Sequence, residues 1–361
     1  MSPGDRRGIR LMADMTMRER MLALVRGEPV DRVPFVQYDH LAAPNEEIWS
    51  TIGRQEMGVL RWTTPFRRDH ANCTRTVTPI VRDGLRGEHT VIETPAGIMQ
   101  SQRFFEPAYN TAWTAEHFVK TPPDYDVLTA WLDDEVIVAD VEPLACARRE
   151  LGEDGLPLVR AERTAFQQLW IQWVSLDDLV CHMMDEPERV ATCIAALQRR
   201  QRDVFGVIAD LDVDFVDIPD NITAPVIGER WFRQYCLPDY NDLASLVDVP
   251  VYVHMDGDLA PLYEAIGESK ISGIDSLSPP PDNDTSPGAA LAMWPHMRVA
   301  INFPASVHLA SPEQVYAVTM DLLEQAGDSG RFQIQISENV PQSHWRQSFP
   351  QIVRAIHDFH D

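Results

Sequence analysis

The feature of this sequence that most constrains its fold is a regular alternation of short apolar segments with longer amphipathic segments after about residue 124. The short segments are rich in β-branched residues, as buried strands are, and the longer ones carry apolar residues at helical spacing. Strands that alternate with helices imply right-handed strand–helix–strand units and a parallel sheet. Together with an earlier run at 33–40, strands are predicted at residues 156–162, 215–218, 249–254, 274–277, 299–302 and 332–338.

A closed barrel fits this pattern better than an open sheet does. The chain has 361 residues, and about seven predicted strands at this length suit an eight-fold barrel. An open dinucleotide-binding sheet carries a G-x-G-x-x-G motif after a strand, and a P-loop protein carries G-x-x-x-x-G-K-[ST]. Neither motif occurs in the chain. We therefore expect an α/β fold, a (β/α)8 TIM barrel.

Local signals mark where the barrel domain begins. Thr16 and Glu19 have the spacing of a capping box, which predicts a helix that starts after Thr16 and ends at Gly27. The residues before this helix are rich in Gly, Pro and Arg. We expect residues 1–14 to form a flexible leader and residues 15–361 to form a single barrel domain.

One early region departs from the alternation of strands and helices. From about residue 58 to residue 113 the chain is rich in Thr and alternates polar with apolar residues, with a turn at residues 95–97. This pattern predicts antiparallel β-hairpins inserted early in the fold. Beyond it, helices are predicted at residues 187–209, at residues 229–247 and from Ser311 to Gly327.

Polar side chains follow the predicted strands, at the positions where a barrel carries its active site. Because the carboxyl ends of all barrel strands meet at one mouth, these residues are expected to converge on one cavity. They are suited to bind a hard or borderline metal ion, or to act as a general acid or base with hydrogen-bonding neighbours. The residues are Asp39, His40, Glu162, Arg163, Asp217, Asp220, Asn221, His254, Asp256, Asn302, Glu338 and Asn339.

The sharpest motif is His254-Met255-Asp256-Gly257. Residues two apart on a strand point to the same side, so His254 and Asp256 can reach one point. Glu338 ends the last strand and would complete a metal site with them. The alternative is that His254 is a strand-end histidine, that Asp256 caps the following helix, and that Glu338 is a surface carboxylate.

The other residues at the strand ends are assigned as follows. Asp220 and Asp39 are the predicted catalytic acid or base groups. The predicted substrate-binding residues are His40, Glu162, Asn221 and Asn302. A turn after Pro219 also explains Asp220 and Asn221, because both residue types suit turns. The aromatic stretch 103–109 and the pair Trp170 and Trp173 are interpreted as packing residues.

Charge and cysteine content exclude several classes of partner. The chain has 31 Lys and Arg against 55 Asp and Glu, a formal charge of −24. Such a field repels nucleic acid and anionic membranes, and a pocket for a highly charged anion would have to overcome it. The five cysteines form no C-x-x-C pair, which indicates a reducing compartment. No apolar run is long enough to span a membrane, so we expect a cytoplasmic protein.

Several segments resemble the uroporphyrinogen decarboxylase superfamily, which also contains corrinoid-dependent methyltransferases. The opening resembles that of the family through Thr16-Met17-Arg18-Glu19-Arg20 and Gly27-Glu28-Pro29-Val30-Asp31-Arg32-Val33-Pro34. Further similar segments follow in the same order, at residues 94–97, 120–125, 184–188 and 232–238. The resemblance covers residues 15–358 and implies a (β/α) barrel.

The two branches of that family differ at positions that can be compared here. Porphyrinogen decarboxylases carry an Arg-rich segment after the first strand, whereas residues 37–45 of this chain contain no Arg. The methyltransferase branch holds zinc with a His-x-Cys at a strand end and a second Cys near the last strand. His254 matches that His, Asp256 stands in place of the first Cys, and Glu338 falls near the second. The chain is thus more similar to the methyltransferase branch.

The exchange of thiolates for carboxylates alters the expected chemistry. A His and carboxylate set leaves a metal more Lewis-acidic and less selective for zinc. We therefore expect zinc, with manganese or iron as alternatives, and a small oxygen-bearing substrate such as a methoxylated compound. The resemblance implies a corrinoid as methyl acceptor. Since the chain has no D-x-H-x-x-G signature, the corrinoid would arrive on a separate carrier protein.

The function expected from the sequence is therefore a metal-dependent methyltransferase or demethylase. Two alternatives stay open. One is a metal-independent decarboxylase or other lyase of the same superfamily, acting on a small molecule that is not a porphyrin. The other is a barrel that binds a ligand without turnover. The partners expected are a small-molecule substrate and a corrinoid protein, and the oligomeric state stays open.

Overall fold

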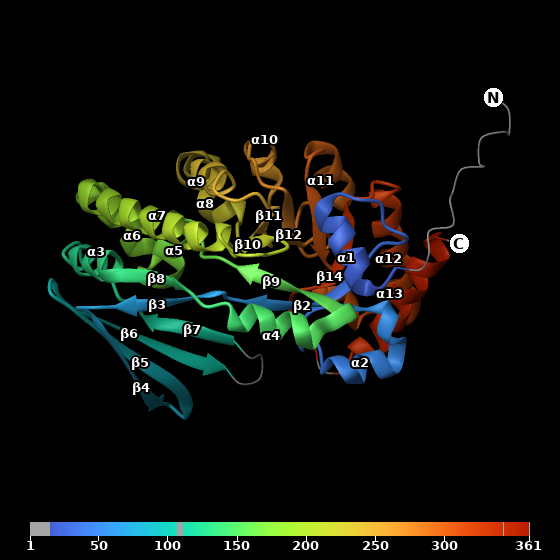
Figure 1. Cartoon of the computed structure of the whole chain (residues 1–361), viewed down its shortest axis with the longest axis horizontal. Coiled ribbons are helices and arrows are strands. Elements are labelled where there is room, and N and C mark those ends of the chain that lie inside the picture. Colours follow the sequence, from blue (N-terminus) through green and yellow to red (C-terminus); the bar gives the residue numbers. More distant parts are fainter. Residues whose placement is uncertain (1–14, 107–110, 342, 361) are drawn as a thin grey trace.

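The structure is a computed structural model that describes residues 15–106, 111–341 and 343–360. The predicted leader at residues 1–14 lies outside the described residues. Eight parallel strands close into a barrel in the order β1-β14-β13-β12-β11-β10-β9-β2, with helices around it (Figure 1). The predicted TIM barrel is confirmed. The barrel strands are β1 Phe35–Tyr38, β2 Gly58–Thr63, β9 Gly155–Arg160, β10 Val216–Ile218, β11 Val251–His254, β12 Gly273–Leu277, β13 Arg298–Asn302 and β14 Phe332–Ile336.

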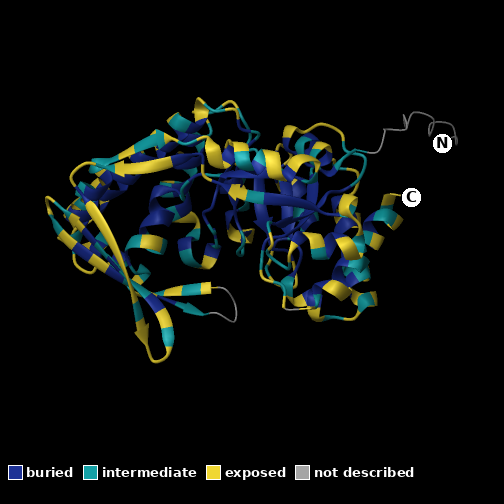
Figure 2. Cartoon of the chain, turned by 60° about the horizontal axis from the view of Figure 1, so that its bottom comes forward, coloured by how far each residue is buried: buried dark blue, intermediate teal, exposed yellow. Residues whose placement is uncertain are grey.

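An antiparallel insertion separates β2 from β9 in the sequence. It forms a two-stranded sheet, β3-β8, and a four-stranded sheet, β4-β5-β6-β7, which extends away from the barrel on the side opposite α13 (Figure 1). Figure 2 shows that much of this sheet is exposed, whereas the barrel strands are buried. The strands of the insertion are β3 Phe66–His70, β4 Thr74–Arg82, β5 Leu85–Thr94, β6 Gly97–Glu106, β7 Thr111–Glu116 and β8 Glu135–Ala139.

The predicted hairpin region is confirmed, but its start at about residue 58 is wrong. Gly58–Thr63 is barrel strand β2, which pairs in parallel with β1 and β9. The insertion begins only with β3, at Phe66. Strand β8 was not expected, because its partner β3 lies far from it in the sequence.

The helices follow the predicted caps closely. Thr16 forms the predicted capping box at the start of α1, and Ser311 forms another with Gln314 at the start of α12. Helix α7 has the predicted bounds. The helices are α1 Met17–Arg26, α2 Asn45–Ile52, α3 Asp124–Asp134, α4 Glu142–Leu151, α5 Ala165–Gln168, α6 Leu176–Asp185, α7 Pro187–Ala209, α8 Ala224–Trp231, α9 Leu237–Leu243, α10 Tyr263–Gly267, α11 Pro287–Met293, α12 Pro312–Ala326 and α13 Trp345–His360.

The helix predicted at residues 229–247 is helical as far as Leu243, but it is not a regular α-helix throughout. Helix α8 passes into a wider π-helical turn at Phe232–Cys236, and α9 follows it. Pro238 lies in the first turn of α9. Because proline has no N–H and its ring collides with the carbonyl four residues earlier, a regular helix cannot run through this point.

Two apolar clusters fill the two sides of the barrel strands. The larger cluster lies between the strands and the surrounding helices. The smaller one contains alternate strand residues, such as Val36, Leu60 and Leu156, packed against Met17 and Met21 of α1. Helix α1 thus covers the apolar part of the barrel interior. Among the residues that the structure describes, no helix is both long and apolar enough to cross a membrane.

The contact between β9 and β2 generates a stability prediction. A Cβ atom at Gly155 would lie 2.1 Å from the backbone oxygen of Val59. Gly155→Ala is therefore expected to lower the free energy of unfolding by about 2 kcal/mol or more, because backbone atoms must move. A Cβ atom at Gly206 in α7 would meet no atom within 4 Å. Gly206→Ala is therefore expected to raise the free energy of unfolding by about 0.5–1 kcal/mol. Urea unfolding of both variants tests this, and equal stability of Gly155→Ala and wild type would contradict it.

Candidate functional site

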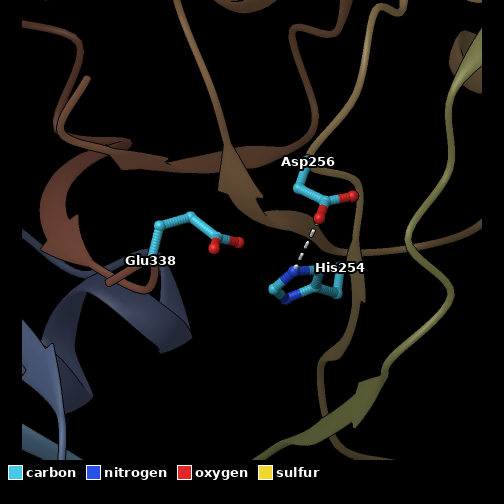
Figure 3. Close-up of side chains that lie close together, drawn as sticks. All are labelled: His254, Asp256 and Glu338. Carbon is cyan, nitrogen blue, oxygen red and sulfur yellow. Dashed lines mark ion pairs between the residues drawn. The ribbon is translucent and has the colours of Figure 1, made fainter. Parts of the chain in front are cut away.

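The structure brings together the three residues predicted as metal ligands. His254 ends β11, Asp256 lies two residues farther along the same loop, and Glu338 lies just after β14. One ligand atom from each of the three lies within 4.8 Å of the others. Figure 3 shows the two carboxylates and the imidazole ring directed toward one point. The Nε2 atom of His254 lies 3.6 Å from Oδ2 of Asp256.

A second carboxylate orients the imidazole ring. Nδ1 of His254 lies 3.0 Å from Oδ2 of Asp275 in β12, and the Tyr38 hydroxyl donates to the same oxygen. Gln335 donates to the other oxygen at 2.7 Å. Since the Asp275 carboxylate accepts a hydrogen bond from the N–H at Nδ1, Nε2 is the ring nitrogen directed at Asp256 and Glu338.

Asp275 and Tyr38 were missed as functional residues from the sequence. Asp275 is 3% exposed and lies within a predicted strand. A charged residue inside an otherwise buried strand is itself unusual, because a buried charge requires partners. That signal was available, but the prediction considered only residues at the strand ends.

The electrostatics of the three residues favour a bound cation. Burial opposes protonation of His254, but Asp256 and Asp275 outweigh it and raise its pKa to about 10. Burial also raises the pKa of Glu338. The pKa of Asp256 is held below its usual range, because His254 and Asn221 outweigh the opposing effect of burial. A metal ion would replace the proton on Nε2 and neutralise the same carboxylates.

Two asparagines at strand ends hold the proposed ligands in place. Asn221 donates to Oδ2 of Asp256 at 2.8 Å and accepts from Arg163 at 2.7 Å. Asn302 is buried, and its Oδ1 accepts from the backbone N–H groups of Ser337 and Glu338 at 3.0 and 3.2 Å. Both side chains are thus engaged with the protein itself.

Asp220 lies apart from the three residues and is fully buried. Its carboxylate accepts from the N–H and hydroxyl of Thr164 at 2.6 and 2.7 Å, and from the Tyr240 hydroxyl at 2.6 Å. Burial raises its pKa to about 6, although these three hydrogen bonds favour the ionised form. This geometry fixes the loop between β9 and α5 and leaves no oxygen of Asp220 directed at solvent.

The structure also places Asp39 and His40 away from the three residues. Asp39 forms an ion pair with Arg61 at 2.5 Å and accepts from Asn45 at 2.7 Å. The His40 side chain is 60% exposed, and its backbone is left-handed with φ at 61°. Asp39 is therefore half-buried and engaged by protein groups, whereas the His40 side chain lies largely in solvent.

Glu162 lines a large cavity beside the barrel mouth. This cavity has a volume of about 930 Å³ and lies between strand ends of the barrel, near Arg160 and Pro219, and strands of the insertion. Six arginines and three glutamates line it. Positively charged side chains therefore gather at this cavity, although the whole chain carries a formal charge of −24. Arg103 and Trp173, which were interpreted as packing residues, also line the cavity.

Comparisons with known proteins agree with this architecture. The sequence profile described as uroporphyrinogen decarboxylase (URO-D) matches residues 174–359, about half of the chain. No curated protein matches the chain. A solved structure described as a methyltransferase from Methanosarcina mazei is similar with a TM-score of 0.61, covering 96% of this chain and 100% of that chain at 12% sequence identity. At this identity the likeness shows a shared fold.

The burial of Asp220 generates a pH prediction. Because its folded pKa of about 6 lies above the ordinary value of 3.8, the stability that Asp220 contributes is full below about pH 4 and falls as the pH rises through 6. The destabilisation caused by Asp220→Asn is therefore expected to shrink by up to about 3 kcal/mol between pH 4 and pH 7. Urea unfolding across this range measures it, with the exposed Asp177→Asn as control. If the destabilisation caused by Asp220→Asn stays constant or grows as the pH rises, the raised pKa of Asp220 is refuted.

Proposed function

Because this chain belongs to the uroporphyrinogen decarboxylase family, we propose that it is an enzyme whose reaction centre is formed by His254, Asp256 and Glu338 and that these residues bind a divalent metal ion. The observation that carries this proposal is the convergence of their ligand atoms within 4.8 Å at the barrel mouth. The hydrogen bond from His254 to Asp275 supports it, since metal-binding histidines usually donate their second N–H to a carboxylate.

The donor set fits a metal of borderline to hard character. One imidazole and two carboxylates suit zinc, and they also suit manganese or iron. Asn221 holds Asp256, and Asn302 holds the backbone of Glu338. Asp256 and Glu338 are thus held in position before a metal binds. This lowers the loss of conformational entropy on metal binding.

The reaction we propose is the transfer of a methyl group from a small methoxylated substrate to a corrinoid on a separate carrier protein. A bound metal ion would polarise the substrate oxygen as a Lewis acid. The bond between oxygen and methyl carbon breaks, its electron pair stays on oxygen, which takes up a proton, and the methyl group passes to the reduced corrinoid. The shared fold with a methyltransferase supports this direction.

The second candidate is a metal-independent carboxy-lyase of the same family. The arginines of the cavity favour it, because they suit a carboxylate-bearing substrate. Asp220 is poorly suited as its acid or base, since all three of its donors are protein groups. Asp39 is half-buried and paired with Arg61, so a lyase mechanism would need a different proton donor.

Metal content tests the reaction centre. Untagged protein is expected to contain about one equivalent of zinc, manganese or iron by elemental analysis. His254→Ala is expected to lose the metal, and Asp275→Asn is expected to weaken metal binding about 10–100-fold because the ring loses the negative charge of its acceptor. His296→Ala, whose ring bonds to the backbone of Ser269, is the control and keeps the metal. Metal content unchanged by His254→Ala would exclude this site.

Activity separates the two candidate reactions. With guaiacol as the methoxylated probe and chemically reduced cobalamin as acceptor, the methyltransferase is expected to form methylcobalamin, visible by its absorbance. A chelator and the Glu338→Gln variant should both abolish this signal. Release of carbon dioxide from a carboxylated probe that continues in the presence of a chelator would instead establish the lyase.

A further inference from the structure

The cavity between the barrel mouth and the insertion has a positive lining in a negatively charged protein. None of the three proposed metal ligands lines it. The negatively charged side chains on its wall are Glu88, Glu135 and Glu162. The positively charged ones are Arg68, Arg75, Arg103, Arg160, Arg163 and Arg200. Positive charge is therefore in excess, although the whole chain carries a formal charge of −24.

Buried polar atoms on this wall lack hydrogen-bond partners. Arg200 is 3% exposed, and none of its three guanidinium nitrogens makes a hydrogen bond. Its Nη2 lies 2.8 Å from Oε2 of Glu135, so the charges are close but poorly aligned. Nε of Arg163, Oε1 of Gln168 and Nε1 of Trp173 are also unpartnered. Because unsatisfied buried polar groups are costly, their gathering around one cavity points to a ligand.

Another part of the same lining is apolar. Phe118 and Trp173 lie with ring centroids 5.2 Å apart, and Trp131 and Ile171 also line the cavity. Aromatic rings of this kind pack against flat apolar groups, while the indole N–H remains free to donate. The cavity therefore offers an apolar surface beside its guanidinium groups.

The glutamates limit the charge that a ligand can carry. Arg68 forms ion pairs with both Glu135 and Glu162, so part of the positive charge is already neutralised. Burial raises the pKa of Glu135 to about 7 even though Arg200 and Arg68 oppose this. A dianion would face these two carboxylates at close range, whereas a monoanion can pair with the remaining guanidinium groups.

We propose that this cavity is a binding site for a small aromatic monocarboxylate, whose carboxylate pairs with the guanidinium groups of Arg160, Arg163 and Arg200 and whose ring packs against Phe118 and Trp173. Guanidinium and carboxylate groups match in a planar, two-bond geometry. The site goes beyond the proposed reaction centre, since it requires no metal and none of the three metal ligands.

Calorimetric titration of the full-length protein tests the proposal, with benzoate and 4-methoxybenzoate as probes. Methyl benzoate is the uncharged counterpart, and phenyl phosphate is the dianionic one. Both acids are expected to bind, and the ester at least about tenfold more weakly. Arg160→Gln and Arg163→Gln are each expected to weaken binding of the acids about tenfold or more, because a charged hydrogen bond is lost.

The control variants separate this site from the metal centre and from general loss of charge. The first control is Arg199→Gln. Arg199 is next to Arg200 on α7, but it is exposed and pairs with Asp133 outside the cavity. This variant is expected to bind the acids as tightly as wild type does. The second control, His254→Ala, is expected to bind the acids equally well. Arg200→Gln removes one of the two arginines that pair with Glu135 and Glu162, so its effect is interpreted only alongside a thermal unfolding curve that matches wild type.

Five outcomes would overturn the proposal. In the first, neither acid binds at concentrations up to about 10 mM. In the second, the ester binds as tightly as the acids, and in the third, Arg160→Gln and Arg163→Gln bind the acids as wild type does. Tighter binding of phenyl phosphate than of benzoate would show that the site takes a dianion. Loss of binding in His254→Ala alone would place the acid at the metal centre, and metal content measured on the same samples keeps the two proposals distinct.

Discussion

The structure depends on the two-residue period of the barrel strands, which sends every second side chain into a closed interior. At one end the inward residues are apolar and pack against α1. Toward the mouth they become polar, with Asp217, His254, Asp275 and Gln335 all buried. In a medium of low dielectric constant buried polar groups need partners, and His254, Gln335 and Asp275 provide them for one another. Asp275 accepts from three side chains, and this network fixes the direction of His254. The same closure that forms the core thus also positions the three proposed metal ligands.

Much of the fold was predictable because its signals are local. The caps at Thr16 and Ser311 and the bounds of α7 depend on residues close together in sequence. Strand β2 was assigned to the hairpins because its partners, β1 and β9, are separated from it by other elements. Nothing within the segment itself distinguishes a barrel strand from a hairpin strand. The π-helical turn before α9 was not predicted either. It depends on one proline, Pro238, within a segment whose apolar residues otherwise have helical spacing.

The site was predictable where the two-residue period of one strand decides which side chains point the same way. His254 and Asp256 lie two residues apart and meet, as the period of a strand requires. The partners of Asp220 come from α9 and the loop before α5, which no local pattern reveals. The positive cavity was missed for a different reason. Net charge describes the whole surface, whereas charges act over about 8–10 Å in salt solution, so six arginines brought together by folding can dominate one cavity.

The insertion enters and leaves the barrel through one pair of neighbouring strands, β3 and β8. It nevertheless supplies one wall of the cavity, including Arg75 and Arg103. The barrel supplies His254, Asp256 and Glu338. The three proposed metal ligands thus come from the barrel alone, whereas the cavity is lined by both the barrel and the insertion. Exchange of the insertion between related barrels would therefore replace one wall of the cavity while His254, Asp256 and Glu338 stay in place.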